Sequence, residues 1–157
     1  MAATKQRERP SVTVDTVMIA LVDGQRSVLL VRRKNPPFAG SWALPGGFVE
    51  PHEPLETAAR RELLEETGVT PARLEQLRAF GDPGRDPRGW TISIAFLAEV
   101  DEAAVRSWHP RAGSDADEVG WFALDHLPPL AFDHEQILGY AARRLAGPGS
   151  PGLEHTG

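Results

Sequence analysis

The stretch from Pro54 to Thr67 constrains the fold more than any other part of the chain. It consists mainly of leucine, alanine, arginine and glutamate, which are strong helix formers. Proline is favoured in the first turn of a helix, and Gly68 follows as a C-terminal stop. The stretch therefore predicts a helix near the middle of the chain.

Segments that favour strands lie on both sides of this helix, because they are rich in β-branched and apolar residues. They are residues 12–22, 27–31, 42–44, 74–80, 90–100 and 118–124. Asp23-Gly24 predicts a hairpin between the first two, and Pro45-Gly46-Gly47 predicts a turn after the third. Asp133 and Gln136 have the spacing of a helix N-terminus, which predicts a helix through Leu145. The fold class expected is α+β, with a mixed β-sheet flanked by helices.

Composition limits the chain to one soluble globular domain. The chain has 157 residues, of which 41% are hydrophobic and 25% are charged, so a second full domain would not fit. Residues 1–10 are polar and end in proline, which predicts a flexible N-terminal arm. Residues 147–157 are rich in glycine and proline, which predicts a disordered tail. The folded domain is therefore expected to span residues 11–146.

Charge and residue usage exclude several classes of function. The formal net charge of -5 disfavours binding to nucleic acid or to an anionic membrane. No apolar run approaches the roughly 20 residues of a membrane span, and the N-terminus lacks the apolar core of a signal peptide. The absence of cysteine excludes disulfides, thiolate metal sites and cysteine nucleophiles. We expect a cytoplasmic protein with no nucleic-acid partner and no membrane partner.

The predicted helix carries three carboxylates on one face. Glu62, Glu65 and Glu66 are spaced i, i+3 and i+4, so their side chains are neighbours on the helix surface. Three like charges repel one another, and such a cluster suits a site where a cation neutralises it. Oxygen ligands favour magnesium or manganese over zinc. The alternative is an ordinary solvated acidic face, and the helix alone does not decide between the two.

The residues around the cluster extend the pattern. Gly47 is followed after five residues by Glu53, and after seven more by Arg61-Glu62-Leu63-Leu64-Glu65-Glu66-Thr67-Gly68-Val69. This pattern resembles the Nudix box and matches it at every fixed position. The resemblance implies a Nudix hydrolase with an α/β/α sandwich fold, which splits nucleoside diphosphates linked to another group with the help of a divalent metal.

The same resemblance implies roles for individual residues. Glu62, Glu65 and Glu66, together with the backbone carbonyl of Gly46, would bind Mg²⁺, with Mn²⁺ as a possible substitute. Arg61 and Glu53 would be structural partners that orient the loop and the helix. The family also implies a homodimer.

The loop Gly81–Trp90 and the segment Leu130–His134 resemble the ADP-ribose pyrophosphatase branch of the family, and also the related Nudix-type regulators of NAD metabolism. Arg85 and Arg88 could donate hydrogen bonds to a diphosphate or a ribose. The alternative is that they pair with Asp82 and Asp86 and stiffen the loop.

Aromatic residues near the box, Trp42 and Phe48 among them, could stack on adenine. The alternative for Trp42 is packing in the core or at a subunit interface. The candidates for the general base are Asp115, Asp117 and Glu118, of which we favour Glu118. The histidines, His134 included, lack the spacing of metal ligands and are expected to be surface, capping or packing residues.

These observations predict a Mg²⁺-dependent pyrophosphohydrolase that cleaves the diphosphate of ADP-ribose to AMP and ribose 5-phosphate. One alternative is a Nudix hydrolase of another nucleotide, such as an oxidised nucleoside triphosphate, NADH or a dinucleoside polyphosphate. A second alternative is a regulator that binds ADP-ribose without turning it over. In each case the expected partner is a small-molecule nucleotide.

Overall fold

The computed structural model describes residues 7–108, 112–113 and 116–147. Within them the elements follow the order β1 (Ser11–Val22), β2 (Gln25–Arg33), β3 (Trp42–Ala43), β4 (Gly46–Phe48), α1 (Leu55–Thr67), β5 (Glu75–Phe80), β6 (Thr91–Val100), α2 (Glu102–Ser107), β7 (Ala116–Ala123) and α3 (His134–Ala146). Residues 1–6 of the predicted arm and residues 148–157 of the predicted tail lie outside the described residues. No helix among the described residues is long and apolar enough to cross a membrane.

The seven strands form one mixed sheet with β1 near its centre. The strand order is β3-β2-β1-β6-β5, with β4 also paired to β1 and β7 also paired to β2. Strand β1 runs parallel to β6 and antiparallel to both β2 and β4. It pairs with β4 over Thr13–Asp15 and with β2 over Ile19–Val22. Because these pairings use different halves of β1, β1 and β2 separate beside Asp15, and a pocket lies in that region.

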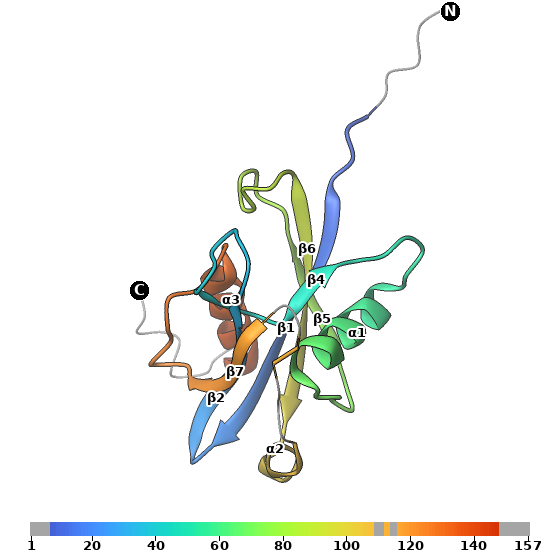
Figure 1. Cartoon of the computed structure of the whole chain (residues 1–157). Coiled ribbons are helices and arrows are strands. Elements are labelled where there is room, and N and C mark those ends of the chain that lie inside the picture. The colour runs from blue at the N-terminus through green and yellow to red at the C-terminus, as the bar shows by residue number, and fades with distance from the viewer. Residues whose placement is uncertain (1–6, 109–111, 114–115, 148–157) are drawn as a thin grey trace, which may run out of the picture.

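Helices cover both faces of the sheet, as Figure 1 shows for α1 and α3. Alternate residues of β1 point to opposite faces. Val17 belongs to the buried cluster that includes Ile137 of α3, whereas Met18 belongs to the cluster that includes Leu63 of α1. All four side chains are fully buried, and each such side chain contributes about 1.5–3 kcal/mol through the area removed from water. The mixed sheet between helices that the sequence predicts is confirmed.

The proline and glycine predicted to bound the central helix, and the Asp-Gly pair predicted to form the first hairpin turn, have these positions in the structure. Helix α1 follows Pro54 and ends at Gly68, which has the left-handed conformation with φ of 78°. Asp23 and Gly24 both have positive φ, at 51° and 78°, as the turn of a two-residue hairpin requires.

One prediction of local structure needs correction, and one short helix was missed. The predicted turn at 45–47 is wrong in part, because Gly46–Phe48 pairs with β1 as strand β4. A Cβ on Gly46 would lie 2.1 Å from the carbonyl oxygen of Val14, so glycine at this position allows the close pairing. The short helix α2 is not predicted by apolar periodicity, although its N-cap Asp101 accepts a hydrogen bond from the Ala104 N–H at 2.7 Å.

Candidate active site

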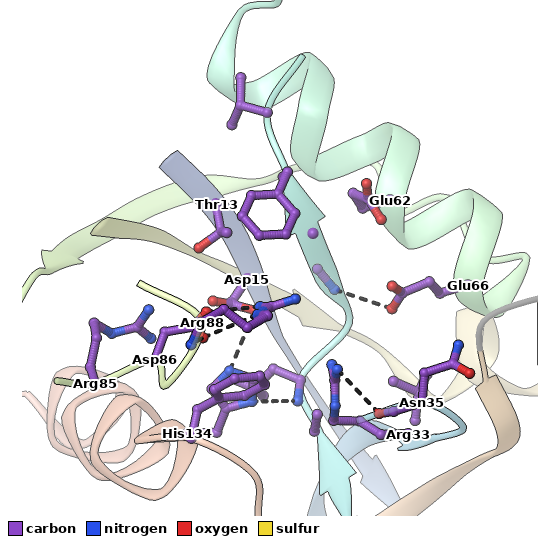
Figure 2. Close-up of a pocket in the computed structure, with 18 of the residues that line it drawn as sticks. Thr13, Asp15, Arg33, Asn35, Glu62, Glu66, Arg85, Asp86, Arg88 and His134 are labelled. Carbon is purple, nitrogen blue, oxygen red and sulfur yellow. Dashed lines mark hydrogen bonds and ion pairs between the residues drawn. The ribbon is translucent and has the colours of Figure 1, made fainter. Parts of the chain in front are cut away.

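A pocket of about 530 Å³ lies where β1 and β2 separate. This volume is within the range of small-molecule sites. Its walls come from β1, the end of β2, the β3–β4 segment, α1, the loop before β6 and the segment before α3. Figure 2 shows that acidic side chains from α1 and arginines from β2 and the loop reach the same pocket.

The pocket brings together two of the three helix carboxylates. Glu62 and Glu66 line it, and the Glu62 side chain is only 13% exposed. Glu65 is not among the lining residues; its side chain is 59% exposed and accepts a hydrogen bond from Arg61 at 3.3 Å. Among the described residues, no three acidic or histidine side chains converge on one metal position.

The backbone next to these carboxylates is built from glycine. The Gly46 N–H donates to Glu66 Oε2 at 3.2 Å. A Cβ on Gly47 would lie 2.6 Å from both carboxylate oxygens of Glu62. Glycine at position 47 therefore leaves space beside Glu62 that any side chain would fill, while the Gly46 N–H contacts Glu66. We call Gly46, Gly47, Glu62 and Glu66 the cradle. Carboxylate and carbonyl oxygens are the donors that Mg²⁺ and Mn²⁺ prefer, so this donor set fits such an ion.

Arg61 joins the loop before α1 to the carboxylate face of the helix. It donates to both oxygens of Glu53, at 2.7 and 2.9 Å, and to Glu62 Oε1 at 2.9 Å. It also donates to the carbonyl oxygen of Phe48 at 3.1 Å. These contacts agree with the orienting role that the family resemblance implies for Arg61 and Glu53.

Hydrogen bonds from Arg61, helped by the N–H of Glu50, lower the pKa of Glu53 to about 2. The contacts with Glu53, and next those with Glu62, raise the pKa of Arg61. The pKa of Glu62 is raised because burial disfavours its charged form, and Arg61 opposes this effect. Arg61 therefore holds Glu53 ionised and keeps Glu62 in a fixed position.

The two loop arginines differ in their surroundings. Arg85 pairs with Asp133 through bonds of 2.9 and 2.6 Å, and its side chain is 4% exposed. The predicted partner Asp82 is therefore wrong for Arg85, because the contact is made across 48 residues rather than within the loop. Arg88 pairs with the buried Asp86, at 2.8 and 3.1 Å, as the alternative for that residue predicts. Both arginines line the pocket.

A hydrogen-bonded group of buried residues lies at the pocket, which His134, Asp15 and Leu44 line. The Leu44 N–H donates to His134 Nδ1 at 3.0 Å, which leaves the proton of the neutral ring on Nε2. That nitrogen lies 3.5 Å from Asp15 Oδ1, and Ser93 donates its hydroxyl to Asp15 Oδ2. Burial lowers the pKa of His134, so the ring is held neutral. The group ties β1, β6 and α3 to the segment that leads into Gly46.

Comparison with known proteins decides the family. The model of the NUDIX domain matches residues 12–143. The chain belongs to the Nudix family. It is 45% identical to the ADP-ribose pyrophosphatase of Methanocaldococcus jannaschii over 129 residues. This aligned region covers 82% of this chain and 71% of that protein. It is also 36% identical to the ADPR responsive transcriptional repressor NtrR of Acinetobacter baylyi over 140 residues. That aligned region covers 87% of this chain and 54% of the repressor.

Solved structures agree with the Nudix fold. A MutT/nudix family protein from Enterococcus faecalis has a TM-score of 0.82 at 37% identity, with 92% of this chain and 65% of that chain covered. The NUDIX domain of Shewanella oneidensis NrtR, complexed with ADP ribose, has a TM-score of 0.79 at 36% identity, with 88% and 90% covered. The chain thus spans about half of the NtrR repressor but most of this isolated Nudix domain.

Of the remaining residues predicted for this Nudix site, one lines the pocket and two do not. Phe48 lines the pocket and is 44% exposed. Trp42 does not line it, because its ring packs edge-on against Phe122 with centroids 4.6 Å apart, as the core-packing alternative predicts. Glu118 also lies outside the lining and pairs with Arg32 at 3.0 Å. Asp115 lies outside the described residues, and the general base of this Nudix protein stays a prediction.

Among the residues that line the Nudix pocket, sequence reasoning assigned no role in the site to Asp15, Arg33, Phe132 or His134. One signal was present for Asp15, which is a charged residue inside an otherwise apolar strand. Phe132 and His134 lie in the segment Leu130–His134, which carries the resemblance to the ADP-ribose pyrophosphatase branch, although His134 is expected there to be a surface, capping or packing residue. Arg33 carries no local signal.

Proposed function

We propose that this Nudix protein is a Mg²⁺-dependent hydrolase that cleaves the diphosphate of ADP-ribose to AMP and ribose 5-phosphate. The observation that carries the proposal is the cradle in which Glu62 and Glu66 face one pocket beside Gly46 and Gly47. The choice of ADP-ribose is supported by the 45% identity to an ADP-ribose pyrophosphatase and by the likeness to a Nudix domain complexed with ADP ribose.

The residues proposed to hold the ion are Glu62, Glu66 and the backbone carbonyl of Gly46, with Glu65 added from the family resemblance. When bound, the divalent ion would neutralise the phosphates and help to polarise the attacking water. Addition of one water across the P–O–P bond gives two monophosphates and releases a proton to a general base, for which Glu118 is the candidate predicted from the sequence.

The protein's own side chains supply orientation. Arg61 fixes Glu62 against the helix, and Glu66 accepts from the Gly46 N–H. Arg88 and the half-exposed ring of Phe48 line the pocket and are proposed to contact the substrate. Such preorganisation raises the rate because the reacting groups do not need to be ordered during the reaction.

A second candidate function is sensing of ADP-ribose without turnover. The 36% identity to an ADPR responsive repressor favours it. Other Nudix relatives broaden the range of substrates, since the NAD-capped RNA hydrolase NudC of Chromobacterium violaceum is 36% identical over 138 residues. Both candidates predict ADP-ribose in the same pocket, and they differ only in whether the P–O–P bond is broken.

Product analysis separates these functions. The purified protein is incubated with Mg²⁺ and, separately, with ADP-ribose, NADH, diadenosine polyphosphates and nucleoside triphosphates, alongside a Glu66→Gln control. We expect Mg²⁺-dependent release of AMP from ADP-ribose that the control lowers by about 100-fold or more without loss of folding. If a different nucleotide is hydrolysed instead, that nucleotide replaces ADP-ribose as the proposed substrate. Tight binding of ADP-ribose without hydrolysis would favour the sensing function.

Three further proposals complete this description. The Nudix domain is proposed to span residues 11–146, to form a homodimer and to act in the cytoplasm. Light scattering coupled to size exclusion tests the homodimer directly, since a monomeric mass would refute it.

A further inference from the structure

His134 is a buried residue of the pocket to which the proposed function gives no role. It is the first residue of α3, is 4% exposed, and accepts a hydrogen bond from the Leu44 N–H at 3.0 Å. Asp15 faces the other ring nitrogen, Nε2, across 3.5 Å (Figure 2). Asp15 is held in turn by the hydroxyl of Ser93, which is fully buried. We call these four residues, which come from four segments of the chain, the polar network.

The Leu44 N–H is the one backbone donor between β3 and β4. Strand β3 ends at Ala43 and β4 begins at Gly46, and Pro45 has no N–H. Leu44 is buried, and a buried N–H without an acceptor is costly. A neutral imidazole accepts at Nδ1 and still donates from Nε2. One histidine therefore satisfies this segment through one nitrogen and faces Asp15 with the other.

The segment that His134 holds leads directly into the cradle. The Gly46 N–H donates to Glu66 Oε2 at 3.2 Å, and the Gly46 carbonyl oxygen is one of the proposed ligands of the ion. The Pro45 carbonyl oxygen accepts from the Thr16 N–H of β1 at 2.9 Å. The backbone just before Gly46 is therefore fixed at two successive residues, by α3 at Leu44 and by β1 at Pro45.

Asp15 supports the same glycine through its side chain. It is the partner of Gly46 in the pairing of β1 with β4, and a Cβ on Gly46 would lie 2.5 Å from Asp15 Oδ1. This is the oxygen that faces His134 Nε2, while Ser93 donates to Oδ2. Since each carboxylate oxygen has its own partner, the Asp15 side chain is kept from rotating against Gly46.

The place of the network in α3 points to the site rather than to general packing. The other buried residues of α3 are apolar and belong to one core cluster: Ile137, Leu138 and Ala141. Such contacts suffice to attach a helix to a sheet, whereas a buried polar side chain costs free energy unless its partners are in place. The one buried polar residue of α3, His134, lies where the helix reaches the pocket.

We propose that His134 is a positioning residue of the metal site, which holds Leu44 and Asp15 and thereby sets the place of Gly46 beside Glu66. The proposal rests on the proposed function for the ligands of the ion and adds the residue that holds one of them. His134 is not itself a ligand, and it acts through the main chain. Replacing a residue that supports a metal ligand typically weakens metal binding 10- to 100-fold.

Two substitutions separate the two ring nitrogens. The side-chain oxygen of asparagine reaches the place of Nδ1, so His134→Asn keeps an acceptor for the Leu44 N–H. Glutamine reaches the place of Nε2, so His134→Gln keeps a polar group at Asp15 and removes the acceptor for Leu44. The matched control is Ile137→Ala, which leaves a cavity under the next turn of the same helix, outside the pocket lining.

Metal binding is measured without substrate, with Mn²⁺ as the probe. Electron paramagnetic resonance follows the loss of the free-ion signal as protein is added, and NMR follows hydrogen exchange of the Leu44 amide in EDTA. We expect His134→Gln to weaken Mn²⁺ binding about tenfold or more and to speed exchange at Leu44. Both quantities should stay within about twofold of the wild type in His134→Asn and in Ile137→Ala.

Several outcomes would overturn this role of His134. Unchanged exchange at Leu44 or unchanged Mn²⁺ binding in His134→Gln would do so. Equal weakening in Ile137→Ala would trace the effect to lost stability, and equal weakening in His134→Asn would exclude the Leu44 contact as its cause. Thermal unfolding checks each variant. If His134→Gln does not fold, Ser93→Ala carries the test, because it removes a partner of Asp15 and should weaken Mn²⁺ binding about threefold or more.

The same experiment keeps this role apart from the proposed function. If Mn²⁺ binding changes as expected but Mg²⁺ produces no hydrolysis of ADP-ribose, the positioning role stands and the proposed function fails. Mg²⁺-dependent hydrolysis together with unchanged Mn²⁺ binding in His134→Gln gives the reverse conclusion.

Discussion

Replacing Gly47 with alanine tests whether the cradle around Glu62 holds the catalytic ion. Gly47 does not have positive φ, so alanine fits its backbone and acts only through the added methyl group. That methyl would lie 2.6 Å from the Glu62 carboxylate, where ordinary contact begins at 3.4 Å. The carboxylate is the end of a flexible side chain and can give way. We therefore expect it to move by roughly 0.8 Å, out of the position that Arg61 now fixes.

The expected effects on stability and on turnover differ widely. Alanine in place of glycine reduces the entropy of the unfolded chain, which offsets part of the cost of moving Glu62. The free energy of unfolding should therefore change by no more than about 1 kcal/mol, or about 2–4 °C in Tm. A displacement close to 1 Å in a catalytic group costs about 100-fold in rate. We expect Gly47→Ala to fold normally, to lose about 10- to 100-fold in kcat and to need more Mg²⁺ for half-maximal activity.

The matched substitution is Gly46→Ala, one residue earlier. Its methyl would lie 2.1 Å from the carbonyl oxygen of Val14 and 2.9 Å from the Cα of Asp15. These are backbone atoms of a central strand and cannot give way cheaply. Gly46→Ala should therefore destabilise the fold by about 3 kcal/mol or more. The assay is ADP-ribose hydrolysis over a Mg²⁺ titration, paired with thermal unfolding. Wild-type turnover and Mg²⁺ dependence in Gly47→Ala would refute the assignment of Glu62 to the ion.

Two further predictions concern the charged pairs around the site. Arg85→Ala should lower the free energy of unfolding by about 3–5 kcal/mol, because it leaves Asp133 nearly buried without its partner. Arg144→Ala, which breaks an exposed pair, should cost less than about 1 kcal/mol in the same denaturant titration. Glu53→Gln should lower Tm most near neutral pH. The contacts with Arg61 lower the pKa of Glu53 from 4.5 to about 2, so the stability that this carboxylate contributes is complete above pH 4.5 and is lost as the pH falls towards 2. A Tm difference between Glu53→Gln and wild type that grows as the pH falls would contradict this reading.

The chemistry of the central helix could be predicted because its signals are local. The spacing of Glu62 and Glu66 places both on one helix face whatever the rest of the chain does. The same spacing applies to Glu65, yet only the folded structure shows that its side chain is 59% exposed and is not part of the pocket lining. A spacing rule gives the face of a helix but not the rotamer that each side chain adopts.

The sequence by itself determined what depends on residues close together in the chain. The central helix with its glycine stop, the Asp23-Gly24 hairpin and the Nudix box all follow from short-range rules of propensity and backbone conformation. These rules were sufficient for the family and for the carboxylates of α1.

Only the tertiary structure decided which distant segments meet. The pairing of Arg85 with Asp133 spans 48 residues, and the contact of His134 with Leu44 spans 90. Arg33 at the end of β2 and Arg88 in the loop before β6 both lie at the Phe132 ring, with their central carbons 4.9 and 5.4 Å from its centre. No local pattern encodes such contacts, since they arise from how the sheet and helices bury their apolar faces together.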